Sequence, residues 1–201
     1  MAYILNDPTI FNLEMNAADV YQLSIGDKIF ENDLLPVRWT GSKGLVTKDI
    51  WIFAAKVGNV KCLEYFHNSR FPYEDRVCDV AAMNGNLECL TYLHKMGYNC
   101  DIETCDLAAF NGHLNCLQYL HENGCPWYTS VCYFTAFNGH LECLRYAHEQ
   151  GCPWGRETCI SAAQNGHLNC LQYAHENGCS WDFRTCKEAA ANDHLECLDH
   201  L

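Results

Sequence analysis

Cysteine and histidine are the residues of this 201-residue chain with the most obvious chemistry, because there are fifteen cysteines and ten histidines. Both residue types bind zinc, and thiols also form disulfides. All cysteines except Cys100 fall into three sets with a 27-residue step: Cys62, Cys89, Cys116, Cys143, Cys170 and Cys197; Cys78, Cys105, Cys132, Cys159 and Cys186; and Cys125, Cys152 and Cys179. Two histidine sets have the same step: His113, His140, His167 and His194; and His67, His94, His121, His148 and His175. A fixed step of this length is the mark of a repeat array.

The regular step argues against a metal centre and against disulfides. Structural zinc needs four ligands that converge within about 2.0–2.3 Å of one ion, whereas a ladder points each set the same way. Stacked helices lie about 8–10 Å apart, which is beyond the roughly 7 Å between Cα atoms that a disulfide allows. We predict reduced thiols packed in a core, with no metal and no cofactor. The alternative is a metal- or redox-responsive scaffold that uses the third set as exposed donors: Cys125, Cys152 and Cys179.

Catalysis and nucleic-acid binding find no support in the sequence. The few serines lie outside any nucleophile motif, and acidic pairs are typical of helix starts, so we predict no catalytic residues and no enzyme. Thirteen basic and twenty-five acidic residues give a net charge of −12. This charge disfavours nucleic acid and anionic membranes, and it suits solubility or a basic partner. The sequence also shows no membrane span and no secretory signal, so we expect a reducing, cytoplasmic location.

Each 27-residue unit predicts two short helices. In the unit 100–126, Asp101 is placed to cap a helix over 102–110, and Asn111-Gly112 makes the turn. A second helix follows over 113–123, and Gly124 ends it in the left-handed conformation. Leucine, cysteine and alanine recur at spacings of three and four, which predicts one apolar face per helix. A helix pair cannot bury that face alone, so the units must stack.

The units divide the chain into two parts. Residues 46–201 hold about six units, with the last one incomplete, and Trp51 replaces the first helix's cysteine in the most divergent first unit. Residues 1–45 show no repeat, and we expect them to cover the first unit as a cap. Tryptophan recurs at one loop position, where we expect it to shield the core, with partner anchoring as the alternative: Trp127, Trp154 and Trp181.

The run A-A-x-N-G-H-L-x-C-L-x-Y followed by G-C resembles the ankyrin repeat. Two features depart from that family: Thr104-Cys105 stands where the family has T-P-L-H, and the unit has 27 residues where the family has about 33. The missing residues fall where ankyrin repeats carry a β-hairpin. The resemblance implies an all-α, ankyrin-like solenoid of stacked helix-turn-helix repeats, with hairpins reduced or absent. This short form is similar to arrays in giant viruses of protists, in which an F-box-like segment often precedes the repeats; residues 34–39 echo it weakly.

The resemblance also implies a function, which is protein–protein interaction through the concave face formed by the first helices and their leading loops. The residues that differ between units at these places are the candidate partner-binding residues: Met83, Asp101, Ile102, Phe110, Tyr128, Thr129, Tyr133, Phe137, Arg156 and Gln164. Leu107 and Phe134 either join this surface or pack between units. The partner is a protein of unknown identity, and a host protein if the chain is viral. A further alternative is a substrate adaptor for ubiquitin ligation, which requires an F-box in residues 1–45.

Overall fold

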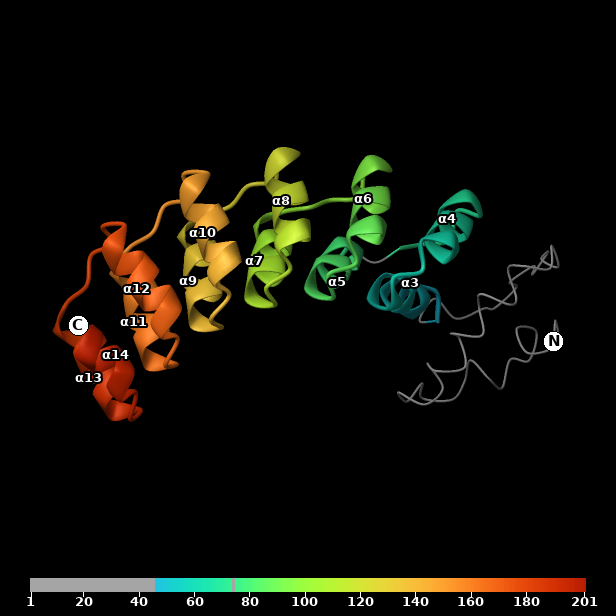
Figure 1. The fold of residues 1–201 in the computed structure, drawn as a ribbon. Helices are drawn as coiled ribbons and strands as arrows, with labels where there is room; N and C mark the ends of the chain where they lie inside the picture. Colours follow the sequence, from blue (N-terminus) through green and yellow to red (C-terminus); the bar gives the residue numbers. More distant parts are fainter. Residues whose placement is uncertain (1–45, 74) are drawn as a thin grey trace.

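The computed structural model describes residues 46–73 and 75–201, and the predictions made for residues 1–45 lie outside this part of the chain. Every regular element in the described residues is a helix, and the helices follow one another as six pairs along an arc (Figure 1). The helices are α3 (Val46–Val57), α4 (Val60–Asn68), α5 (Val77–Met83), α6 (Leu87–Lys95), α7 (Ile102–Phe110), α8 (Leu114–Glu122), α9 (Thr129–Phe137), α10 (Leu141–Glu149), α11 (Arg156–Gln164), α12 (Leu168–Glu176), α13 (Phe183–Ala191) and α14 (Leu195–His200).

The predicted cap of the third pair is present. Asp101 Oδ1 accepts hydrogen bonds from the backbone N–H groups of Glu103 and Thr104, at 2.9 and 3.4 Å. Thr104 Oγ1 in turn accepts from the N–H of Asp101 at 3.1 Å, which completes a capping box. These contacts satisfy backbone donors that a helix start leaves without a partner, and they fix the first residue of α7.

Glycine ends both helices of a pair by the same geometry. Gly112 has φ +72°, and the next residue, His113, donates its N–H to the carbonyl of Ala108 at 2.9 Å. Gly124 has φ +80°, and the N–H of Cys125 bonds to the carbonyl of Leu120 at 3.0 Å. Both are Schellman motifs, in which a residue at positive φ lets the chain reverse and satisfies the last carbonyls.

The core runs without interruption along the array because the small residues predicted to face inward do so. Cys105, Ala108 and Ala109 of α7 are fully buried, and Leu117 and Leu120 of α8 cover them. In Figure 1 the odd-numbered helices from α3 to α11 line the inner side of the arc and their partners line the outer side. Successive inner helices contact each other more extensively than successive outer helices do. Alanine and cysteine allow that close approach, so the array curves toward the inner side.

The first pair replaces the cysteine of the inner helix with Trp51, as the sequence indicated. The Trp51 side chain is fully buried, and its ring lies against Tyr98 and Phe66 at centroid distances of 5.4 and 5.6 Å. The large ring fills space that a thiol fills in later pairs, which explains the divergence of this unit. None of the helices in the described part of the chain has the length and apolar run that a membrane span requires.

Candidate partner-binding surface

The candidate residues of the inner surface lie at two levels of the inner helices. Four of them are the last residues of successive helices: Met83 of α5, Phe110 of α7, Phe137 of α9 and Gln164 of α11. The others, except Tyr133 in the middle of α9, lie at helix starts or in the preceding loops. Because the inner helices lie side by side along the arc (Figure 1), their ends form one row and their starts form another.

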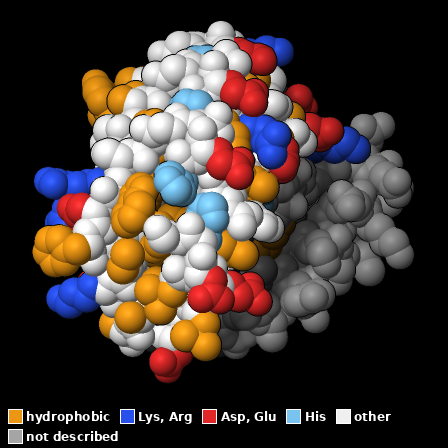
Figure 2. Space-filling model, turned by 60° about the vertical axis from the view of Figure 1, so that its left-hand side comes forward, with side chains coloured by type: hydrophobic (Ala, Val, Ile, Leu, Met, Phe, Trp, Pro, Cys, Tyr) orange, Lys and Arg blue, Asp and Glu red, His pale blue; other side chains and the backbone are white. Residues whose placement is uncertain are grey.

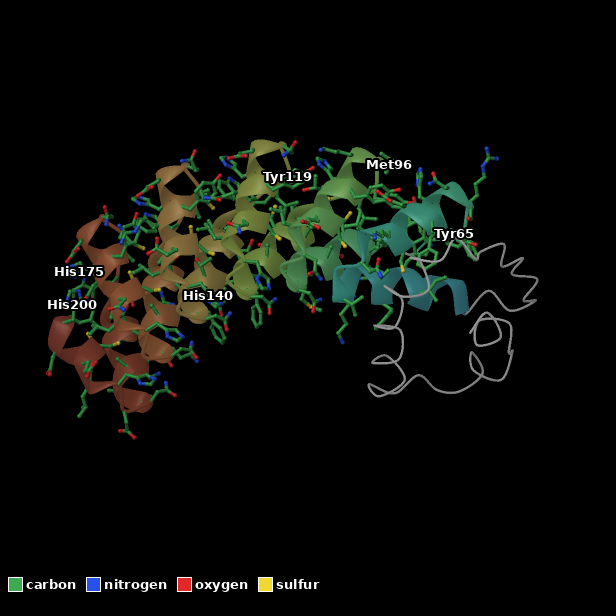
Figure 3. The ribbon with its side chains drawn as sticks, turned by 45° about the vertical axis from the view of Figure 1, so that its right-hand side comes forward. Tyr65, Met96, Tyr119, His140, His175 and His200 are labelled. Carbon is green, nitrogen blue, oxygen red and sulfur yellow. The ribbon has the colours of Figure 1, made fainter. Side chains whose placement is uncertain are left out.

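A ladder of histidines holds the row of helix ends in register. His113 donates Nε2–H to the carbonyl of Met83 at 3.0 Å, and His140 does the same to Phe110 at 3.0 Å. His194 repeats the bond to Gln164 at 3.1 Å. Figure 3 shows His140 at the edge of the array opposite Met96 and Tyr119. These bonds satisfy carbonyls that a helix end leaves open, and they fix the spacing between neighbouring candidates.

Aromatic side chains form a continuous cluster across α7 and α9, and we call it the aromatic ridge: Phe110, Tyr133, Phe134 and Phe137. The rings of Phe110 and Phe134 are 5.7 Å apart, those of Tyr133 and Phe134 5.3 Å, and those of Tyr133 and Phe137 5.8 Å. Phe110 is 41% exposed. Phe137 is only half-buried rather than open, because it leans on Tyr133. Phe134 packs partly against the core, so it contributes to both the core and the ridge.

The second row lies around the helix starts. Its members differ in exposure and in whether their side chains already form contacts within the protein. Tyr128 is 55% exposed, and Ile102 and Thr129 beside the neighbouring helix starts are also exposed. The carboxylate of Asp101 is already used as the helix cap. Arg156 lies 3.6 Å from Glu157 and 3.7 Å from Asp182 in exposed ion pairs, which contribute little to stability. Tyr128 and Ile102 are therefore the more available members of this row.

The outer helices carry the second histidine ladder, which ties neighbouring repeats together. His121 Nδ1 lies 3.0 Å from the hydroxyl of Tyr146, and the ring of Trp127 stacks on the His121 ring at 4.0 Å. His148 repeats both contacts with the next repeat, as the sequence period requires. At the last junction His200 takes the tyrosine's place, and its Nε2 lies 3.3 Å from Nδ1 of His175 (Figure 3).

The loop tryptophans differ in exposure. Trp127 and Trp154 pack partly against the core, as expected for a shielding role, whereas Trp181 is 37% exposed.

The third cysteine set is buried, which argues against the alternative of a scaffold that uses these cysteines as exposed donors. Cys125, Cys152 and Cys179 are 7%, 3% and 3% exposed. The thiols of Cys152 and Cys179 donate to the carbonyls of Tyr128 and Gly155, each at 3.2 Å, because the loop folds back over the pair instead of projecting as a hairpin. In residues 46–73 and 75–201 no group of three or more His, Cys, Asp and Glu side chains is placed to hold a metal ion. The buried cysteines of this part of the chain are free thiols.

Two polar contacts between inner helices were not foreseen from the sequence. Thr104 Oγ1 donates to Asp79 Oδ1 at 2.7 Å, and Ser130 Oγ donates to Asp106 Oδ1 at 2.7 Å. Burial raises the pKa of both carboxyl groups, and the hydroxyl contacts act in the opposite direction. The two residues of each pair are 25 and 24 positions apart, which is close to the 27-residue step. The repeat itself was therefore the sequence signal that could have indicated these contacts.

Comparison with known proteins identifies the repeat. A family model described as "Ankyrin repeats (3 copies)" matches residues 105–185, and one described as "Ankyrin repeats (many copies)" matches residues 78–121. The chain belongs to the ankyrin-repeat family. The crystal structure of the human ASB11 ankyrin repeat domain is similar to this ankyrin array with a TM-score of 0.65 and 17% identity, over 74% of this chain and 80% of that one. A search of curated proteins found no match.

Membership of the family sets a general expectation for the inner surface. Ankyrin repeats generally mediate protein–protein interaction, and proteins built from them are typically scaffolds without catalytic activity. The fold itself, an all-α solenoid of stacked pairs, is as predicted, and no strand occurs in the described loops between pairs. The 27-residue unit therefore keeps the ankyrin helices and shortens the connection.

Proposed function

We propose that this ankyrin array is an interaction scaffold that holds a protein partner on the inner surface of repeats two to five, without chemistry of its own. The aromatic ridge and the exposed Met83, at 39%, carry the proposal. Exposed apolar clusters on a water-soluble surface usually mark binding sites, since water leaves them when a partner packs there. The histidine bonds to the helix ends hold this surface in a preformed shape, which keeps the ordering cost of binding low.

The proposal includes the partner and the setting expected from the sequence. The partner is a protein, and a host protein if the chain comes from a virus, as the short repeat suggests. Many buried free thiols suit a reducing, cytoplasmic compartment. A role in ubiquitin ligation depends on residues 1–45, which lie outside the described residues; deleting them and measuring binding to a ligase scaffold protein tests that role.

Affinity capture followed by mass spectrometry tests the main proposal. Phe110→Ala is the informative variant, because Phe110 is exposed and its removal should lower the free energy of unfolding by less than about 1 kcal/mol. Combining it with Phe137→Ala should abolish capture of the partners that the wild type retains. Met96→Ala removes an exposed hydrophobic side chain from the outer side and serves as the control. Unchanged capture by the double variant, with unchanged helix content, would remove the ridge from the binding surface.

A further inference from the structure

Charge is unevenly distributed along the inner helices and their leading loops. Residues 75–83 and 101–110 carry five carboxylates and one guanidinium: Asp75, Asp79, Asp101, Glu103 and Asp106, and Arg76. Residues 127–137, which form α9 and its leading loop, carry no charged side chain. The surface therefore passes from an acidic part on α5 and α7 to the uncharged aromatic ridge on α7 and α9. Figure 2, which brings the C-terminal repeats forward, shows hydrophobic side chains gathered in neighbouring clusters with acidic side chains beside them.

The single guanidinium of the acidic part is already shared. Arg76 Nη2 lies 2.8 Å from Glu103 Oε1, and Arg76 Nε lies 3.5 Å from Asp79 Oδ2. Among the described residues, only the hydroxyl of Ser130 donates a hydrogen bond to the Asp106 carboxylate, and no cationic side chain forms an ion pair with it. The Asp106 carboxylate therefore has a neutral hydrogen-bond donor and no positive charge beside it. Glu103 adds a second negative charge nearby.

Asp106 and the aromatic ridge lie on one face. Asp106 and Phe110 are four residues apart on α7, which places them one turn apart on the same side of the helix. Ser130 brings the start of α9 against Asp106, and Tyr133 and Phe134 follow on the next turn of α9. A side chain that reached Asp106 would therefore pass beside aromatic rings.

We propose that the partner is a peptide segment that carries an arginine or lysine at Asp106 and apolar side chains over the aromatic ridge. This inference rests on the proposed function and adds the chemistry of the partner to it. Arginine fits best, because its planar guanidinium can pair with a carboxylate and stack on an aromatic face. The net charge of −12 would also attract a basic segment from a distance. Asp106 lies one turn closer to the start of α7 than Phe110 does, so the basic side chain lies toward the helix starts and the apolar ones toward the helix ends.

Selection from a random peptide library displayed on phage tests the inference with the full chain as bait. We expect the enriched peptides to contain arginine or lysine close to aromatic or aliphatic residues. A synthetic copy of the most enriched peptide then serves as the probe in fluorescence polarisation. Asp106→Asn keeps the oxygen that accepts from Ser130 and removes the charge, so it should weaken binding of this probe by about three- to tenfold and reduce its salt dependence. Glu122→Gln, the same change at an exposed position of the outer helix α8, should leave the affinity unchanged.

The outcomes separate the inference from the proposed function. Enriched peptides that are acidic or uncharged, or an affinity that Asp106→Asn does not change, would overturn the inference. If such peptides still lose binding on Phe110→Ala, the inner surface remains the binding site. Peptides whose binding depends on neither Phe110 nor Asp106 would refute both proposals.

Discussion

Substituting alanine at each of two turn glycines, Gly139 and Gly151, separates two costs. One is the strain of a left-handed backbone angle, and the other is the steric clash with a neighbouring histidine ring. Gly139 has φ +74° and Gly151 has φ +80°, so both substitutions place alanine in the left-handed region. A Cβ on Gly139 would lie 2.5 Å from Nδ1 of His167 in the next repeat, whereas a Cβ on Gly151 has no atom within 4 Å. Gly151→Ala is therefore the matched control for Gly139→Ala.

The expected magnitudes follow from these distances. The left-handed angle costs alanine about 1–2 kcal/mol, and part of this is offset because alanine lowers the entropy of the unfolded chain. We expect Gly151→Ala to lower the free energy of unfolding by about 1 kcal/mol. Gly139→Ala adds the displacement of a packed ring, about 1–3 kcal/mol, and weakens the His167 bond to the carbonyl of Phe137. Its total should be about 2–4 kcal/mol.

Urea unfolding followed by circular dichroism measures both variants. The same Gly139→Ala change made in a His167→Ala background should cost no more than Gly151→Ala does, because the ring is gone. Equal losses for Gly139→Ala and Gly151→Ala in the wild-type background would show that the ring moves aside freely. That result would refute the claim that the histidine ladder is tightly packed against the turn glycines.

The buried titratable groups lead to three further expectations. Burial lowers the pKa of His167 below its usual 6.5, so its contribution to stability is present above that value and is lost as the pH falls through the folded-state pKa. His167→Asn copies Asn86, whose Nδ2 donates to the Ala55 carbonyl, and should reduce the fall in the urea midpoint between about pH 7 and pH 5; an unchanged fall would contradict this. Burial raises the pKa of Asp79 above 3.8, so its contribution is present below that value and is lost as the pH rises through the folded-state pKa. Asp79→Asn should therefore raise the urea midpoint near pH 7, since the amide oxygen still accepts from Thr104, and a lower midpoint would count against it. Ellman's reagent should label the half-buried thiols of Cys100 and Cys186 before the buried ones. Early labelling of the third cysteine set would disagree with its burial.

Only some properties of the surface residues could be predicted from the sequence. The variable positions on the inner helices could be named from the repeat, and Met83 and Phe110 are indeed exposed. Sequence spacing does not say which neighbouring side chain leans on which, so it could not show that Phe137 rests on Tyr133. It also left open whether Phe134 belongs to the core or to the surface, and its ring contacts both.

By itself the sequence determined the repeat unit, because its signals are local. Glycine at positive φ, the cap at Asp101 and the apolar spacing each act within one turn or one helix, and six copies in register leave stacking as the way to bury the apolar faces. Only the tertiary structure decided the burial of Cys152 and the link from Ser130 to Asp106. These depend on how the loop folds back over its own pair and on how closely small residues let the next helix approach. Both contacts join residues that stand 24 positions apart in the chain, so no local pattern of residues records them.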